Sequence, residues 1–143
     1  MKVAQEFRQV RETSENPNLK LCLLLASDRL EEIRMALAAG VQSYCLKTSP
    51  IERLAEAIRR THAGYFYLDP AIALQLLGWV RERESEAILT QPELEVLASL
   101  AAGSTDEAIA QNLGTNVETV KTHIANILDR LYVSDWVQRA VKV

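Results

Sequence analysis

The residues best able to do chemistry lie in the last of three helical patterns between Leu89 and Val133. One side of that pattern is apolar at helical spacing and must face a core: Val120, Ile124, Ile127, Leu128 and Leu131. The other side carries carboxylate, hydroxyl, ammonium, imidazole, amide and guanidinium groups: Glu118, Thr119, Lys121, Thr122, His123, Asn126 and Arg130. Most of these groups can hydrogen-bond to base edges or phosphates. The pattern is typical of a helix-turn-helix that places one helix in DNA.

Each of the three helical patterns opens on a residue that can cap it. Thr90 and Glu93 have the spacing of a capping box, Thr105 precedes the second helix, and Asn116 precedes the third. Gly103 and Gly114 follow the first two helices, where glycine commonly ends a helix. These signals predict three short helices joined by tight turns.

An α/β pattern precedes them. Leu19–Ala26 is an apolar run of strand length, which predicts a strand buried on both faces, and Val41–Leu46 predicts a second strand. Asp28 is expected to cap the helix between them. Ser49-Pro50 opens another helix, with Leu54, Ala57, Ile58 and Thr61 facing inward. The alternation of strand and helix predicts a parallel α/β layer.

Two further segments are predicted to be helical. Lys2–Glu15 spaces Val3, Phe7 and Val10 by four and three. Residues 68–87 form a helical linker, in which Ile72, Leu76 and Val80 share a face and 81–86 are charged.

Composition and length set limits on function. The 143 residues suffice for one ordinary domain or two small ones, and the apolar run Leu21–Ala26 is too short to cross a membrane. The polar amino terminus does not resemble a signal peptide, and Cys22 and Cys45 are expected to be buried thiols of a cytoplasmic protein. His62 and His123 lack neighbours at metal-ligand spacing. We therefore expect no enzyme, no metal and no cofactor.

Charge is distributed unevenly. The chain carries a net charge of −3, and residues 88–143 contain four basic and seven acidic side chains, which is the whole excess. Since phosphate neutralisation dominates affinity for DNA, this balance counts against tight binding by a single copy.

The second half resembles the carboxy-terminal domain of the LuxR/FixJ/NarL class of transcription regulators. The matching motifs are LT and E with EVL in Leu89–Leu97, AAG at Ala101–Gly103, IA at Ile109-Ala110, and TVKTH with NIL in Thr119–Leu128. The resemblance implies a four-helix domain whose third helix enters the major groove and whose fourth, from about Asp135, contacts a second copy. It also implies that Lys121 and Thr122 approach bases.

The resemblance further implies that Thr119, His123, Asn126 and Arg130 reach phosphates or neighbouring bases. Each also has a structural alternative: Thr119 supports the helix start, His123 is packed or solvated, Asn126 holds the adjoining turn, and Arg130 is a solvated residue. Acidic Asp106, Glu107 and Asp129 replace polar or basic residues of the family pattern, which weakens the expectation of DNA binding.

The first half, from Asn16 to Leu77, resembles the carboxy-terminal half of a receiver domain of bacterial response regulators, through ASD and LAAGVQSYCLKTSP. The resemblance gives Lys47 the position of a phosphoryl-contacting lysine and Tyr44 that of an aromatic residue that moves on activation. The strands that carry the phosphorylated Asp and the metal-binding acids in that family precede this segment, and Leu25 stands where a hydroxyl is expected. Lys47 is therefore expected to be a solvated or ion-paired remnant.

These features predict a fold of the α/β plus all-α class: a truncated receiver-like (flavodoxin-like) α/β half at 1–67, a helical linker at 68–87 and a four-helix helix-turn-helix domain at 88–143. The expected function is transcription regulation on double-stranded DNA, as a homodimer, without phosphorylation control. The first strand has an edge that a second copy, the segment Lys2–Glu15, or preceding chain could cover. The alternative function is that of a protein-interaction module, or of an antagonist of a full-length response regulator, with weak or no DNA binding. A response regulator or RNA polymerase is a possible partner.

Overall fold

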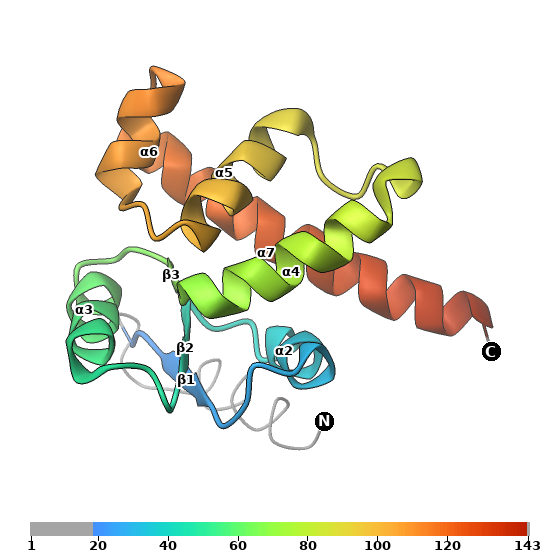
Figure 1. Ribbon diagram of the computed structural model, residues 1–143, viewed down its shortest axis with the longest axis horizontal. Helices are drawn as coiled ribbons and strands as arrows, with labels where there is room; N and C mark the ends of the chain where they lie inside the picture. Colours follow the sequence, from blue (N-terminus) through green and yellow to red (C-terminus); the bar gives the residue numbers. More distant parts are fainter. Residues whose placement is uncertain (1–18, 143) are drawn as a thin grey trace. The chain divides into compact units, whose positions relative to one another are not determined.

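The computed structural model describes residues 19–142, and the side chains of residues 19–132. The chain divides into two compact units, Met1–Asp69 and Pro70–Val143 (Figure 1). The helix predicted over Lys2–Glu15 lies outside the described residues.

A small parallel sheet organises the first unit. Its strands are β1 (Cys22–Leu25), β2 (Ser43–Leu46) and β3 (Tyr67–Leu68), in the order β1-β2-β3. Both strand pairs are parallel, as the alternating pattern predicted. Strand β3 was not predicted, because a two-residue strand has no periodicity that a sequence can show.

Two helices cover the sheet from opposite sides. These are α2 (Leu30–Leu37) and α3 (Ile51–His62), as Figure 1 shows. A chain of hydroxyl hydrogen bonds joins α3 to the sheet: the backbone N–H of Tyr67 donates to Ser43 Oγ at 3.1 Å, Ser43 Oγ and Thr61 Oγ1 lie 2.6 Å apart, and Thr61 Oγ1 donates to the carbonyl of Ala57 at 2.6 Å. Because Thr61 gives its only proton to Ala57, Ser43 must be the donor in the central bond.

A buried carboxylate closes the carboxyl end of β2. Asp69 is fully buried, and its Oδ2 accepts from the backbone N–H of Leu46 at 3.2 Å, from Ser49 Oγ at 2.5 Å and from Cys45 Sγ at 3.4 Å. Its Oδ1 lies 3.6 Å from the guanidinium of Arg53. These bonds supply the partners that a buried charge requires, and they tie the segment after β3 to the start of α3.

Three expectations for the first unit were wrong. Strand β1 is not buried on both faces, because Leu24 is 50% exposed. Asp28 does not cap α2, whose N-cap is Arg29 without a side-chain cap bond; Ser27 Oγ instead accepts from the Arg29 backbone N–H at 3.0 Å. Ile58 does not face inward, since it is 65% exposed. Helical spacing identified which side of α3 faces the sheet, but it did not show how far around the helix the buried surface extends.

The second unit is helical. It contains α4 (Pro70–Glu82), a 3₁₀ turn (Glu84–Glu86), α5 (Gln91–Ala101), α6 (Asp106–Leu113) and α7 (Val117–Lys142). Helix α4 packs on α5, so the segment expected as a linker belongs largely to this unit, and its predicted face is buried at Ile72, Leu76 and Val80. The α/β plus all-α class is thus confirmed.

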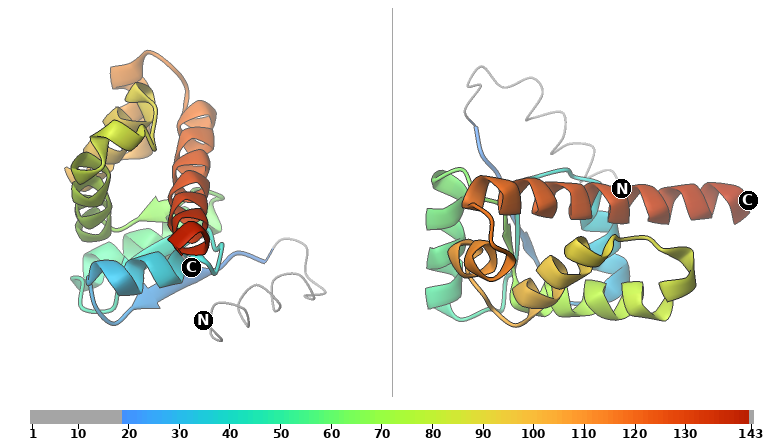
Figure 2. Two further views of the ribbon diagram at one scale, coloured as in Figure 1. Left: turned by 90° about the vertical axis from the view of Figure 1, so that its right-hand side faces the viewer. Right: turned by 90° about the horizontal axis from the view of Figure 1, so that it is seen from above.

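Helix α7 corrects the predicted end of the domain. A separate fourth helix was expected from about Asp135, but α7 runs unbroken to Lys142 (Figure 2). Neither glycine nor proline stands between Leu131 and Trp136, so no residue there favours a break in the helix. Without a residue that favours a left-handed turn, the backbone continues its helical hydrogen bonds.

Candidate nucleic-acid interface

Side-chain caps fix the three helices that build the candidate interface. Thr90 and Glu93 form the predicted capping box, with the Thr90 backbone N–H donating to Glu93 Oε1 at 2.9 Å and the Glu93 N–H donating to Thr90 Oγ1 at 3.3 Å. Thr105 accepts from the Ala108 N–H at 3.2 Å. Gly114 ends α6 in the left-handed conformation, at φ 66°. These predictions are confirmed, and each cap contributes about 1 kcal/mol to helix stability.

One face of α7 is anchored in the core of the unit. Val120 and Ile124 are fully buried, and Ile127 and Leu131 are nearly so. Leu128, predicted on the same face, is half-buried. With helices α5 and α6 packed on this face, α7 cannot rotate about its axis, so the direction of its polar side chains is set by the core.

The hydroxyl groups of the polar face are engaged within the helix. Thr119 donates to Asn116 Oδ1, both from its backbone N–H at 2.8 Å and from Oγ1 at 3.0 Å. Thr122 Oγ1 donates to the carbonyl of Glu118 at 3.1 Å. Since each hydroxyl has one proton and donates it within the helix, each oxygen can only accept a hydrogen bond from a further partner. Thr122 is exposed and can contact a thymine methyl, while Thr119 supports the helix start, as its structural alternative stated.

Lys121 lies beside an acid. Its Nζ is 3.4 Å from Glu118 Oε1, and its side chain is 21% exposed whereas that of Glu118 is 82% exposed. A phosphate or guanine that receives the ammonium must compete with this carboxylate. Ala125, one turn after Lys121 and three residues after Thr122, adds only a methyl group to this side of the helix.

Arg130 forms an ion pair that the sequence did not predict. Its Nε lies 3.2 Å from Glu93 Oε2, where the Glu93 side chain is 4% exposed and that of Arg130 is 48% exposed. The other oxygen of Glu93 belongs to the capping box. Arg130 therefore neutralises a buried carboxylate between the start of α5 and the fourth turn of α7. The role at a phosphate that the resemblance implies for Arg130 stays a prediction, since its side chain is still 48% exposed.

The remaining predicted residues spread over the outer surface of α7. Asn126 is exposed, and His123 and Thr119 are half-buried. Asn126, Thr119 and His123 lie on one flank of the outer surface and Lys121 on the other, at 100° per residue around the helix axis. A groove that receives α7 would meet both flanks. The geometry does not separate the base-contacting side chains from those that only approach phosphates, so their roles stay predictions.

The acids of the unit differ in their exposure. Asp106, expected near phosphate, is only 7% exposed and lies in the first turn of α6, where the helix dipole favours a negative charge. Glu107, Glu118 and Asp129 are exposed. The electrostatic opposition to DNA is therefore smaller than the count of acids suggests, because both Asp106 and Glu93 are withdrawn from the surface.

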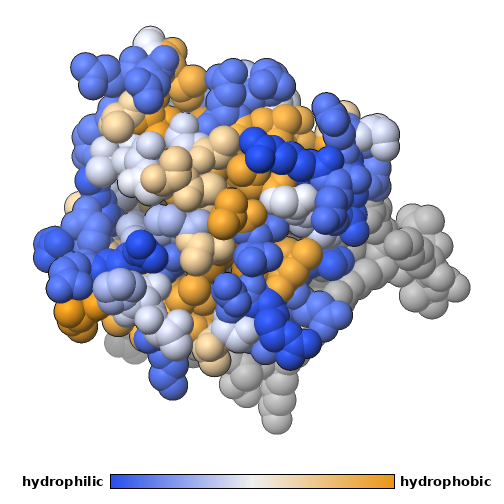
Figure 3. Space-filling model, viewed as in Figure 1, coloured by the Kyte–Doolittle hydropathy of each residue, from blue (hydrophilic) through white to orange (hydrophobic). Residues whose placement is uncertain are grey.

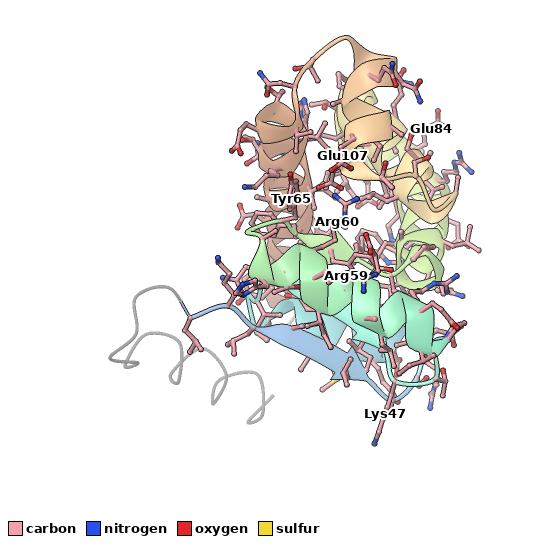
Figure 4. The ribbon with its side chains drawn as sticks, turned by 90° about the vertical axis from the view of Figure 1, so that its left-hand side faces the viewer. Lys47, Arg59, Arg60, Tyr65, Glu84 and Glu107 are labelled. Atoms are coloured by element: carbon pink, nitrogen blue, oxygen red, sulfur yellow. The ribbon has the colours of Figure 1, made fainter. Side chains whose placement is uncertain are left out.

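The two residues that the receiver resemblance singles out, Lys47 and Tyr44, differ in their exposure. Lys47 follows β2, is exposed and projects away from the sheet (Figure 4). Tyr44 is 2% exposed and Leu25 is 6% exposed. Among the described side chains, no group of three or more His, Cys, Asp or Glu residues could hold a metal ion.

Both cysteines are free, and Cys45 is buried as predicted, whereas Cys22 is only partly buried. Burial raises the pKa of Cys45 to about 12, helped by the hydrogen bond and negative charge of Asp69. Burial also raises the pKa of Cys22. Since the thiolate is the reactive and metal-binding form, neither side chain is suited to redox or metal chemistry. Within residues 19–142, no helix is both long and apolar enough to span a lipid bilayer.

Comparison with known proteins agrees with this geometry. Residues 87–143 match the family described as bacterial regulatory proteins, luxR family. The chain is 34% identical, over 126 residues, to the response regulator protein VraR of Staphylococcus aureus strains Mu3 and NCTC 8325. The aligned region covers 87% of this chain and 60% of VraR, so the chain spans less than two thirds of these curated relatives. Residues 87–143 are thus a helix-turn-helix domain of the luxR family, in a chain that is similar to a response regulator through most of its length.

Proposed function

We propose that this chain is a DNA-binding transcription regulator of the response-regulator type that acts as a homodimer. The observation that carries the proposal is the capped unit of α5, α6 and α7, in which a buried stripe holds α7 while its polar side stays exposed. A helix held in this way can enter the major groove of duplex DNA without loss of its own packing. In a homodimer, two such helices would read half-sites about 34 Å apart.

Within this proposal Lys121 and Thr122 approach bases, and Thr119, His123 and Asn126 approach phosphates or neighbouring bases. Lys121 donates to guanine acceptors and Thr122 offers its methyl group to thymine. Arg130, whose guanidinium lies at Glu93, would act by holding α7 against α5.

A salt titration tests the proposal. The full chain is bound to duplex DNA from its own upstream region at several salt concentrations, beside Lys121→Ala. We expect the affinity of the variant to fall and its log–log salt slope to be lower by about 1. Lys47→Ala, the loss of an exposed cation in the first unit, serves as the control. Equal and salt-independent binding by the wild type and Lys121→Ala would refute the proposed function.

We propose further that DNA binding by this chain is not controlled by its own phosphorylation. Support comes from the apolar Leu25 at the position of the family's hydroxyl residue and from the exposure of Lys47. Phosphoryl transfer to a carboxylate requires an acid nucleophile and a divalent metal beside that lysine. Incubation with acetyl phosphate and Mg²⁺ should leave the intact mass unchanged, and Lys47→Ala should bind DNA like the wild type; a phosphorylated adduct lost in Lys47→Ala would contradict this.

One observation favours a second function, that of a protein-interaction module which antagonises a full-length response regulator. Exposed Glu118 and Asp129 lie on the outer side of α7, and Glu118 already pairs with Lys121. An acidic outer side of α7 opposes phosphate, so it fits a domain that contacts a protein in place of DNA. The same salt titration separates the two functions, because the module would show no salt-dependent binding.

A further inference from the structure

We propose that α3 is the surface through which two copies of this chain associate, with the two α3 helices antiparallel. This inference names the contact of the homodimer in the proposed function and rests on that function. Ile51 and Ile58 are 72% and 65% exposed, which is unusual for two isoleucines on one short helix. A hydrophobic group is visible on the outer side of α3 at the lower left of Figure 3.

The spacing along α3 is that of a helix-pairing seam. Ile51, Ala55, Ile58 and His62 follow one another at intervals of four, three and four, which places them in one stripe along the helix. The inward side of the same helix is a different one, occupied by buried Ala57 and Thr61. Ala55 stands at the middle of the stripe, where its small side chain lets a second helix approach closely.

Charges beside the stripe select the partner and its direction. Glu52 lies next to the stripe in the first turn, and Arg59 lies on the same side two turns later. An antiparallel pair with its twofold axis near Ala55 places each Ile51 near the partner's Ile58 and each Glu52 near the partner's Arg59. A parallel pair in register would instead place each Glu52 beside the partner's Glu52 and each Arg59 beside the partner's Arg59. Opposite charges that flank an apolar seam set the orientation of paired helices, so the stripe is complementary to itself.

Arg59 can form an ion pair with the Glu52 carboxylate of a second copy. Its guanidinium lies 2.9 Å from Glu56 Oε2 within the chain, while its side chain remains 67% exposed. Glu56 also receives Arg60 Nε at 2.8 Å, and the guanidinium of Arg60 lies over the ring of Tyr65, 5.3 Å from its centroid. Glu56 therefore keeps a partner when Arg59 turns to a second copy. Figure 4 shows Arg59 and Arg60 on α3 and Tyr65 just after it.

Charge reversal provides the test. Sedimentation velocity is measured on the full chain from about 1 to about 100 μM, because one helix pair predicts a dissociation constant in or above the micromolar range. Glu52→Arg and Arg59→Glu should each weaken self-association by about tenfold or more, since each replaces both symmetric attractions with repulsions. An equimolar mixture of the two variants should dimerise again, because one copy then carries arginine at both positions and the other carries glutamate at both. The double reversal should also dimerise.

Two further variants keep the test sensitive. Ile58→Gln should weaken self-association without lowering the melting temperature, because Ile58 is exposed in the single chain. Ala55→Cys should form a disulfide between copies under mild oxidation, whereas Glu31→Cys, at an exposed position of α2, should not.

The outcomes distinguish this inference from the proposed function. Unchanged self-association in both single reversals would overturn the α3 contact, as would a wild-type monomer at every concentration. DNA binding is measured on the same samples. A chain that dimerises through α3 but shows no salt-dependent DNA binding would overturn the proposed function and leave the α3 contact standing.

Discussion

Replacing Arg130 tests whether this residue stabilises the fold or contacts DNA. Arg130→Met keeps most of the aliphatic stem and removes the guanidinium, so Glu93 would keep the Thr90 N–H but lose its ion-pair partner. Removing one partner of a fully buried pair costs about 3–5 kcal/mol. Arg130 is 48% exposed, so water screens part of this interaction, and we expect a loss of about 1–2 kcal/mol in the free energy of unfolding of the second unit.

Both tryptophans of the chain, Trp79 and Trp136, belong to the second unit. Urea unfolding followed by tryptophan fluorescence therefore reports on that unit. Glu93→Gln/Arg130→Met should recover part of the loss, because the amide oxygen still accepts from Thr90 and no buried charge remains. DNA affinity of the folded Arg130→Met should stay close to that of the wild type. Unaltered stability together with weakened, less salt-dependent DNA binding would refute this reasoning and restore the phosphate role.

Three more changes have definite expected outcomes. Glu118→Gln should raise DNA affinity about two- to fivefold at low salt, since an exposed carboxylate no longer competes for Lys121; an unchanged affinity in filter binding would show that Lys121 does not reach DNA. Alkaline conditions should destabilise the first unit between about pH 9 and 12. Burial is the main cause that raises the pKa of Cys45 and of Tyr67 to about 12, so both groups stay protonated in the folded state. The unfolded chain releases those protons at lower pH, and the free energy of unfolding therefore falls as pH rises through this range. Cys45→Ala should flatten this slope in thermal melts followed by circular dichroism. Acid should also destabilise the first unit, through Glu56, because hydrogen bonds from Arg60 and Arg59 lower the pKa of its carboxyl. The stability that Glu56 contributes is present above the pKa of the unfolded chain and is lost as pH falls through the pKa of the folded state. Glu56→Gln should remove this pH dependence.

The sequence was most informative where structure depends on neighbours three or four residues apart. The capping box of Thr90 and Glu93, the cap at Asn116 and the buried stripe through Val120 and Ile124 all have that range, and all were predicted correctly. The fold class followed from the alternation of such local patterns.

Contacts between distant residues were not visible in the sequence. Glu93 and Arg130 are ionisable residues with several possible partners each, and only the packing of α7 on α5 brings them together. Asp69 is similar: Asp69-Pro70 reads as a helix start, but the carboxylate turns back to Ser49 and Arg53. Residue types predict which groups need partners, and tertiary structure decides which partners they have.

The charges of α7 explain why two copies would be needed. Lys121 lies at Glu118 and Arg130 at Glu93, so both cations between Val117 and Leu131 are engaged with carboxylates. A single copy would thus gain little from phosphate neutralisation. Two helices on one duplex double that gain, and the second one binds at the high effective concentration that the dimer creates. If the dimer forms through α3, Arg59→Glu should lower DNA affinity although it lies outside the DNA-binding domain, and mixing it with Glu52→Arg should restore affinity. Full affinity of Arg59→Glu alone, at protein concentrations where it is monomeric, would show that one copy suffices.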